Sequence, residues 1–307
     1  MAPTTAMEMS NPPIRSKAVS RPTCHRSPKI PPAPSHPHPP LIAPPSRWLW
    51  KAHFTPRAIS LSSPHFPRAM AKEITEMPVE LVTTELPDTK TLRLKWPDGH
   101  NPEFKTGQFI TIFWPDTPGY KRAYSLSSCA LDRGHYEVTI KREGKMGTRI
   151  VDWAKAGDTF GVLPPAGKFL PVLEPEKHLI CIAGGSGVTP FRGFVREATR
   201  RELATKITVL YSVRTTNDII FNHEFHDLAA ENPNFSFYVT CTRLVPEDPW
   251  TGHRGRITAD WVREQVHDLP NTVFYACGPN PLVEFAEEIV LKGLGVPKEQ
   301  MKTEKWG

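Results

Sequence analysis

The sequence predicts a two-domain α+β protein, in which an antiparallel β-barrel (residues 73–172) precedes an α/β doubly wound parallel sheet (residues 175–307). Short apolar runs separated by Pro, Asp and Gly turns predict the barrel. Strands that alternate with helices predict the parallel sheet. A sharp change of composition near residue 70 separates both domains from an N-terminal head. The length of 307 residues is enough for about two domains.

The head, residues 1–72, holds many of the 34 prolines, and we predict that it is disordered or polyproline-like. Three interpretations are open. The head could be an organelle transit peptide, because it is rich in Arg and Ser and Glu8 is the only acid in its first 70 residues. It could be a proline-rich interaction tail. It could also be a non-native extension upstream of a true start at Met70, which we favour because the composition changes abruptly there. The expected location is then the cytoplasm, or an organelle stroma or matrix if the head is a transit peptide.

Charge and cysteine content exclude several functional classes. The formal net charge of +6 comes from the head, so the folded part has no basic excess that would bind nucleic acid. The 5 cysteines are widely separated and show no metal-ligand spacing, so we expect no metal and no iron–sulfur cluster held by this chain. No apolar run reaches the ~18–20 residues of a membrane span.

In the first domain, strands are predicted at residues 79–86, 91–96, 109–114, 136–141 and 159–163. The stretch from Arg122 to Ser125 reads as a further extended segment, with Arg122 and Tyr124 on one face. An arginine can bind a phosphate bidentately, an aromatic ring can stack on a flat heterocycle and a hydroxyl can bond its edge, which are the requirements of a flavin dinucleotide. Gly147 and Thr148, at the start of a short helix over 149–153, would offer N–H groups to an anion.

In the second domain, strands are predicted at 178–183, 207–211, 235–240 and 273–276, with helices at 190–203, 221–230, 258–266 and 281–291 and a last short run at 301–306. Ligands bind at the carboxyl ends of such strands. The glycine-rich loop 184–190 follows the first strand and would let a pyrophosphate approach the backbone, with Thr189 as helix N-cap and Pro190 in the first turn. Asn280 and Pro281 form a second pair of this kind.

Three strand ends carry candidate ligand-binding side chains. Arg214 and Arg243 follow the second and third strands of this domain and favour the 2′-phosphate of NADPH over the ribose hydroxyl of NADH. Cys277 ends the fourth strand and would face the ligand crevice. A reactive nucleophile is a poor interpretation of Cys277, because no His lies close in sequence to activate it.

Taken together and in this order, Arg122-x-Tyr-Ser125, Gly184-Gly-x-Gly-x-Thr-Pro190 and Cys277-Gly-Pro279 resemble the ferredoxin–NADP reductase superfamily over residues 75–307. The resemblance implies FAD in the barrel domain and NADPH or NADH in the second domain. By it, the FAD-binding residues are Arg122, Ala123, Tyr124, Ser125, Thr139, Ile140, Lys141, Gly147 and Thr148. The implied coenzyme-binding residues are Gly185, Gly187, Thr189, Ser212, Arg214, Arg243, Cys277, Gly278 and Pro279.

The resemblance also assigns roles in catalysis. Ser125 would bond near flavin N5 and Cys277 would lie against nicotinamide C4. Plant-type members end in Glu-x-Tyr, whereas this chain ends in Glu304-Lys-Trp306-Gly307. Glu304 would join a proton network and Trp306 would cover the flavin, but the different ring leaves a strict NADPH preference open. The tail also resembles bacterial oxygenase reductases, which often favour NADH.

The implied function is hydride transfer between NAD(P)H and FAD, with single electrons passing to or from a separate acceptor. The expected partner is ferredoxin or another small redox protein. Two alternatives remain: a reductase component of an oxygenase or desaturase system, and a non-catalytic, flavin-bound regulatory module.

Overall fold

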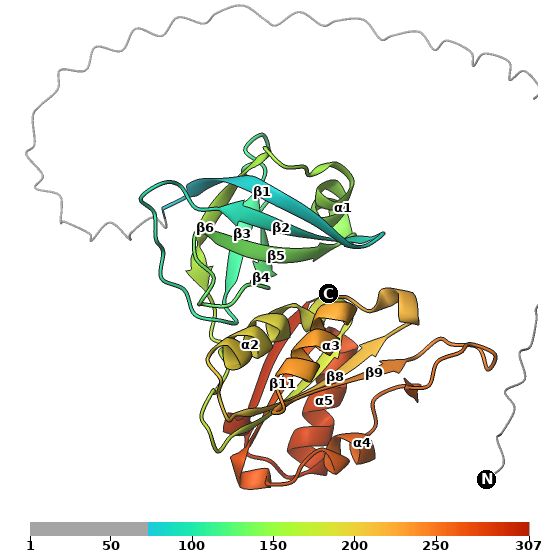
Figure 1. The fold of residues 1–307 in the computed structure, drawn as a ribbon. Coiled ribbons are helices and arrows are strands. Elements are labelled where there is room, and N and C mark those ends of the chain that lie inside the picture. Colours follow the sequence, from blue (N-terminus) through green and yellow to red (C-terminus); the bar gives the residue numbers. More distant parts are fainter. Residues whose placement is uncertain (1–72, 307) are drawn as a thin grey trace, which may run out of the picture. The chain divides into compact units, whose positions relative to one another are not determined.

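The first domain of the structure, a computed structural model, is an antiparallel barrel, coloured blue to green in Figure 1. Its strands run in the order β4-β3-β6-β1-β2-β5, and an isolated bridge between Leu126 and Val138 joins the two edges. The strands are β1 (Thr75–Leu86), β2 (Thr89–Lys95), β3 (Phe109–Phe113), β4 (Arg122–Ser125), β5 (His135–Lys141) and β6 (Thr159–Ala166). The structure describes residues 73–306, so the predicted head and Gly307 lie outside it.

Helix α1 (Gly144–Trp153) is longer at its start than the predicted 149–153, because the chain turns into it directly after β5. Gly147 and Thr148 therefore lie inside the helix rather than at its first residue. A Cβ atom at Gly147 would clash with the carbonyl oxygen of Lys141. The glycine thus allows α1 to pack closely against the end of β5.

The second domain is a parallel sheet with the order β10-β9-β8-β7-β11-β12. Its strands are β7 (His178–Gly184), β8 (Lys206–Val213), β9 (Phe235–Cys241), β10 (His253–Arg254), β11 (Thr272–Pro279) and β12 (Met301–Trp306). Its helices are α2 (Thr189–Arg200), α3 (Asn222–Glu231), α4 (Ala259–Glu264) and α5 (Asn280–Glu287), which continues as a π-helical turn, Glu288–Gly293. The strand order reverses at β7 and β11, which is where such sheets bind ligands.

Both faces of this sheet are buried, as expected for a doubly wound fold. Along β7, Leu179, Cys181 and Ala183 join the core formed with α2 and α3. The intervening Ile180 and Ile182 join the core formed with α4 and α5. The two-domain architecture predicted from the sequence is therefore confirmed.

The prediction for the cap of α2 is wrong. The glycine loop ends in a 3₁₀ turn, Gly185–Val188, and Thr189 is the first residue of α2 rather than its N-cap. The Thr189 hydroxyl donates a hydrogen bond to the carbonyl oxygen of Ser186 at 2.7 Å. Likewise α5 begins at Asn280, with Pro279 in the cap position.

Within residues 73–306, no helix is long and apolar enough to cross a membrane. The same residues contain no group of three or more His, Cys, Asp and Glu side chains placed to hold a metal ion.

Gly187 should be intolerant of a side chain because the loop passes directly against β11. A Cβ atom there would clash with the carbonyl oxygen of Cys277. We expect Gly187→Ala to lower the free energy of unfolding by about 1–3 kcal/mol, the usual cost of overpacking, as measured by urea denaturation. Gly119→Ala is the matched control, since a Cβ atom at Gly119 meets nothing within 4 Å. Equal midpoints for the two variants would refute this account of the loop.

Candidate active site

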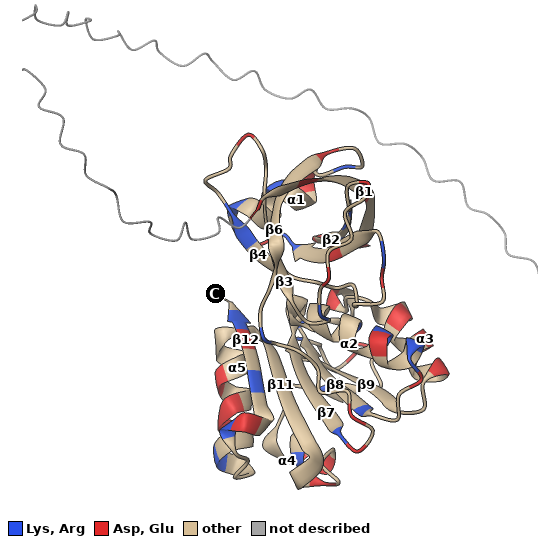
Figure 2. Ribbon diagram, turned by 90° about the vertical axis from the view of Figure 1, so that its left-hand side faces the viewer, with Lys and Arg blue, Asp and Glu red and all other residues tan. Residues whose placement is uncertain are grey.

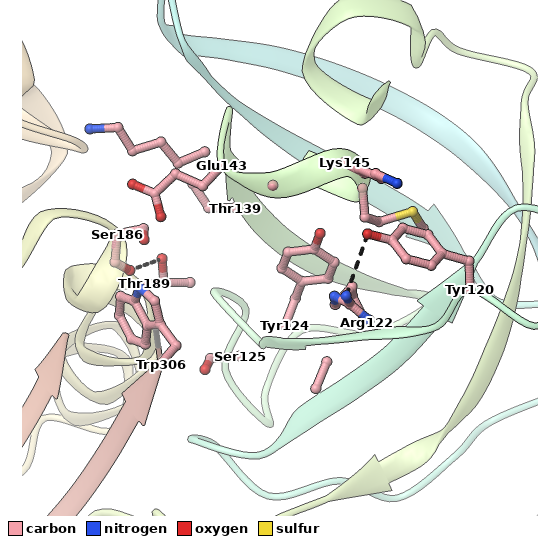
Figure 3. Close-up of a pocket in the computed structure, with 14 residues that line it drawn as sticks. Tyr120, Arg122, Tyr124, Ser125, Thr139, Glu143, Lys145, Ser186, Thr189 and Trp306 are labelled. Carbon is pink, nitrogen blue, oxygen red and sulfur yellow. Dashed lines mark hydrogen bonds between the residues drawn. The ribbon is translucent and has the colours of Figure 1, made fainter. Parts of the chain in front are cut away.

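A cavity of about 240 Å³ lies where the barrel meets the carboxyl ends of the parallel strands. Figure 3 shows the barrel residues Tyr120, Arg122 and Tyr124 on one side and Ser186, Thr189 and Trp306 on the other. Most of the predicted flavin-binding stretch, including Ala123, Ser125, Thr139 and Lys141, also lines this cavity. Segments far apart in the sequence thus form a single site.

The barrel wall of the cavity offers a cation beside an aromatic surface. The Arg122 guanidinium lies 4.6 Å from the ring centroid of Tyr120, and its Nη2 donates to the Tyr120 hydroxyl at 3.4 Å. Arg122 is exposed and forms no ion pair with a carboxylate in the described part of the chain, so its charge is available to a phosphate. Burial raises the pKa of Tyr124 to about 12, so its ring stays neutral at ordinary pH.

The opposite wall is formed by the glycine loop and the last strand. Gly185 has φ +55 and open space around its Cβ position, so a ligand can approach the backbone there. Ser186 and Thr189 present hydroxyls at the start of α2, and Trp306 presents its ring. Gly187 lies behind them, packed on Cys277.

Three of the predicted catalytic residues meet at the back of the cavity. The Ser125 hydroxyl, from β4, donates to Glu304 Oε2 at 2.8 Å, and Cys277 Sγ lies 3.9 Å from the same oxygen. The pairing of β11 with β12 sets Cys277 opposite Glu304. Glu304 therefore connects the barrel to the strand end of the parallel sheet.

The protonation of this group follows from its burial. Burial raises the pKa of Glu304 and outweighs the hydrogen bonds from Ser125 and Cys277, which lower it. Burial also raises the pKa of the Cys277 thiol, with the Glu304 carboxyl adding to the effect. Cys277 is fully buried and stays a thiol, which agrees with the expectation that it is no nucleophile.

Two further cavities lie at the ends of β8 and β9, and the smaller of them reaches the glycine loop. One, of about 210 Å³, includes Gly185, Ser212 and Arg214 in its lining. The other, of about 660 Å³, includes Ser212, Arg243 and Arg256. None of these three arginines pairs with a carboxylate among residues 73–306, so the far end of the path is basic.

The structure separates the predicted residues into two groups. Those that line one of the three cavities are Arg122, Ala123, Tyr124, Ser125, Thr139, Lys141, Gly185, Thr189, Ser212, Arg214, Arg243, Pro279 and Trp306. Those that do not are Ile140, Gly147, Thr148, Gly187, Cys277, Gly278 and Glu304. Ile140 is core, with 1% of its surface exposed. Glu304 contacts the lining residue Ser125, and Cys277 contacts Glu304.

Several lining residues were not predicted. In the first cavity they are Tyr120, Glu143, Gly144, Lys145, Met146 and Ser186, and in the largest the notable one is Arg256. Tyr120 lies in the turn before Arg122, so its aromatic ring near a candidate phosphate ligand was a usable signal. No sequence signal pointed to Arg256, because only the pairing of β10 with β9 brings this residue to the strand end.

The donor set fits a flavin dinucleotide. It combines a guanidinium that has no carboxylate partner within residues 73–306, a neutral aromatic ring, a hydroxyl that donates to an acid, and the backbone N–H groups of the first turn of α1, at Gly144 and Lys145. Residues Arg122, Tyr124 and Ser125 would hold the group from the barrel side.

Comparisons with known proteins agree with this geometry. The family model described as "Oxidoreductase FAD-binding domain" matches residues 76–170, and "Oxidoreductase NAD-binding domain" matches residues 181–288. One component of the Na(+)-translocating NADH-quinone reductase of Klebsiella pneumoniae is 29% identical over 264 residues, which cover 71% of this chain and 64% of that protein. The reductase component of the glycine betaine monooxygenase of Chromohalobacter salexigens is 27% identical over 208 residues, covering 66% and 56%. The chain thus spans less than two thirds of the length of these relatives.

Solved structures share the fold. A ferredoxin NADP+ reductase from Neisseria gonorrhoeae with bound FAD and NADP matches with a TM-score of 0.64 and 23% identity, covering 76% of this chain and 99% of that one. The cytochrome b5 reductase domain of Ulva prolifera nitrate reductase matches with a TM-score of 0.67 and 24% identity, covering 76% and 98%. With both family models matched in the expected order, the chain belongs to the oxidoreductases that combine an FAD-binding domain with an NAD-binding domain, and it shares the fold of these solved reductases.

Proposed function

We propose that this chain is an NAD(P)H-dependent flavoprotein reductase that accepts hydride from the coenzyme and passes electrons singly to a separate protein. The observation that carries the proposal is the contact of Ser125, from the barrel, with Glu304, from the parallel sheet. In this proposal Glu304 is the proton-holding group, and its contact with Ser125 lies where the two domains meet. Bound FAD would supply the hydride acceptor and the conversion from two-electron to one-electron chemistry.

In this proposal the residues of the chain align ligands and handle one proton. Arg122 and Tyr124 bind and orient the flavin, while the glycine loop and Ser186 hold the coenzyme. Glu304 holds a proton in a partly buried site, where its Oε2 accepts from the Ser125 hydroxyl. Transfer needs this hydrogen bond to reverse, so that Ser125 turns to donate into the cavity while its oxygen accepts the proton of Glu304. Trp306 covers the site from the sheet side.

The acceptor we propose is ferredoxin or a similar small iron–sulfur protein, in the cytoplasm. Two relatives support a separate acceptor: the reductase component of glycine betaine monooxygenase and a structure described as ferredoxin reductase in carbazole 1,9a-dioxygenase. These names also keep a second candidate, the reductase component of an oxygenase system.

The direct test is to purify the full chain, record its visible spectrum and add NADPH or NADH without oxygen. We expect a yellow protein that is bleached by the coenzyme and then reduces ferricyanide or an added ferredoxin over many turnovers. A protein that binds FAD but is not bleached would instead be a non-catalytic flavin module. A protein that stays colourless with added FAD would contradict the proposal altogether.

The raised pKa of Glu304 predicts a pH dependence. Because the neutral carboxyl is favoured, its proton is held below a pKa that lies above the ordinary 4.5 and is lost as pH rises through that value. The rate of flavin reduction should therefore fall as pH rises through this pKa, and Glu304→Gln, which cannot titrate, should remove this inflexion.

Ser125→Ala should slow flavin reduction about tenfold with FAD still bound, as expected for the loss of roughly 1.4 kcal/mol. Stopped-flow rates at a series of pH values test both, and an unchanged profile in Glu304→Gln would exclude the proton-holding role.

The basic end of the path predicts a preference for NADPH. A charge-assisted contact of Arg243 with a 2′-phosphate contributes about 1.5–3 kcal/mol, so Arg243→Ala should lower kcat/KM for NADPH by roughly 10- to 100-fold. The value for NADH should be nearly unchanged. Arg263→Ala is the control, since this exposed arginine pairs with Asp260 and lines none of the three cavities. An equal fall in kcat/KM for NADPH and NADH would show that Arg243 does not bind a 2′-phosphate.

A further inference from the structure

A group of buried and partly buried charges joins the barrel to the parallel domain and takes no part in lining the cofactor cavity. We call it the interdomain ion cluster: Arg93 of β2, Glu137 of β5, Arg192 and Arg196 of α2, and Glu224 of α3. Figure 2 shows α2 and α3 beside the barrel, with basic and acidic segments close together. Glu137 is the only carboxylate of the cluster that belongs to the barrel.

Each carboxylate oxygen of Glu137 faces a different domain. Oε1 accepts hydrogen bonds from Arg93 at 2.9 and 3.0 Å, within the barrel. Oε2 accepts from Arg192 at 2.8 Å and from Arg196 at 3.1 Å, across the interface. The Glu137 side chain is 5% exposed and that of Arg192 is 8% exposed, so water screens this contact little.

The cluster is built to keep Glu137 ionised. Burial opposes ionisation, but the charges of Arg192 and Arg196 and the hydrogen bond from Arg93 outweigh it and hold the pKa of Glu137 at about 2. The carboxylate is therefore charged throughout the physiological pH range. Another cross-domain pair, Arg200 with Asp132, is more exposed, with 46% of the arginine side chain accessible, and such pairs contribute less.

The two elements that the cluster ties together, β5 and α2, each contribute a residue to the lining of the cavity. On β5, Thr139 lines the cavity and lies two residues from Glu137, on the same face of the strand. On α2, Thr189 lines the cavity and lies one helical turn before Arg192. A shift of α2 away from β5 would therefore widen the cavity directly.

We propose that Glu137 is a positioning residue that sets the width of the cofactor cavity by holding β5 against α2. A fixed cavity width keeps Ser125 aligned with Glu304. It also keeps a ligand bound to the barrel aligned with a ligand bound to the sheet. This inference rests on the proposed reductase function for its kinetic outcome. Its structural outcome does not depend on that function.

The chain offers a matched control for the test. Glu224 contacts the same two arginines, Arg192 and Arg196, but it belongs to the same domain as they do. Each of the substitutions Glu137→Gln and Glu224→Gln removes one of the two carboxylates that contact Arg192 and Arg196. The other carboxylate stays in place. Of the two variants, only Glu137→Gln removes a carboxylate that bridges the domains, while the contacts of Asp132 with Arg196 and Arg200 remain in both.

The experiment compares the FAD-loaded wild type, Glu137→Gln and Glu224→Gln in anaerobic stopped flow over a range of coenzyme concentrations. We expect Glu137→Gln to retain FAD and to lower the limiting rate of flavin reduction by about tenfold or more, because a misplacement of about 1 Å can cost 10²-fold. Glu224→Gln should keep the limiting rate within about twofold. Glu137→Asp, which keeps the charge but shortens the reach, should fall between wild type and Glu137→Gln.

Amide hydrogen exchange supplies a readout independent of turnover. Exchange in residues 122–126 and 185–189 should rise in Glu137→Gln and not in Glu224→Gln. Equal rates and equal exchange in the two variants would overturn the inference and leave the cluster as a stabilising element only. If Glu137→Gln does not fold, the comparison is made with Glu137→Asp, where unchanged exchange counts against the inference. If the wild type is not reduced by any coenzyme, the proposed function fails and hydrogen exchange alone decides the role of Glu137.

Discussion

The pairing of β12 with β11 is the constraint on which the site depends. It is a parallel pairing in which Cys277 lies opposite Glu304 and Pro279 lies opposite Trp306. A shift of one residue would send these side chains to the other face of the sheet. Glu304 would then lose Ser125, and Trp306 would leave the cavity. The last six described residues therefore complete a site whose other wall begins some 180 residues earlier, at Tyr120.

Burial explains the chemistry of the site more than any single charge does. Glu304 has its pKa raised because partial burial disfavours its charged form, whereas Glu137, more deeply buried, has its pKa lowered because Arg192, Arg196 and Arg93 face it. The same type of side chain thus holds a proton in one place and a permanent charge in the other. The first suits proton transfer, and the second suits a fixed connection between domains.

Much of the fold and part of the site could be predicted because both follow from local patterns. The structure contains the short strands of the barrel and the strand–helix alternation of the second domain. Of the predicted site residues, Arg122, Tyr124, Ser125 and Thr189 line the cavity between the domains. The predicted N-cap role of Thr189 is wrong, because α2 follows the 3₁₀ turn Gly185–Val188 directly and begins at Thr189. A Cβ atom at Gly147 or Gly187 would clash with a backbone carbonyl oxygen, so close packing requires glycine at both positions, and their contact with ligands stays a prediction.

The sequence by itself determined the order of the domains, the periodicity of their elements and the chemical types that a flavin and a nicotinamide coenzyme require. Only the tertiary structure decided which of these residues meet. Ser125, Cys277 and Glu304 lie on different strands, and β10 brings Arg256 to a strand end that no local pattern marks. The physical reason is that periodicity reports which face a residue takes, whereas contacts between elements depend on register and packing over the whole chain.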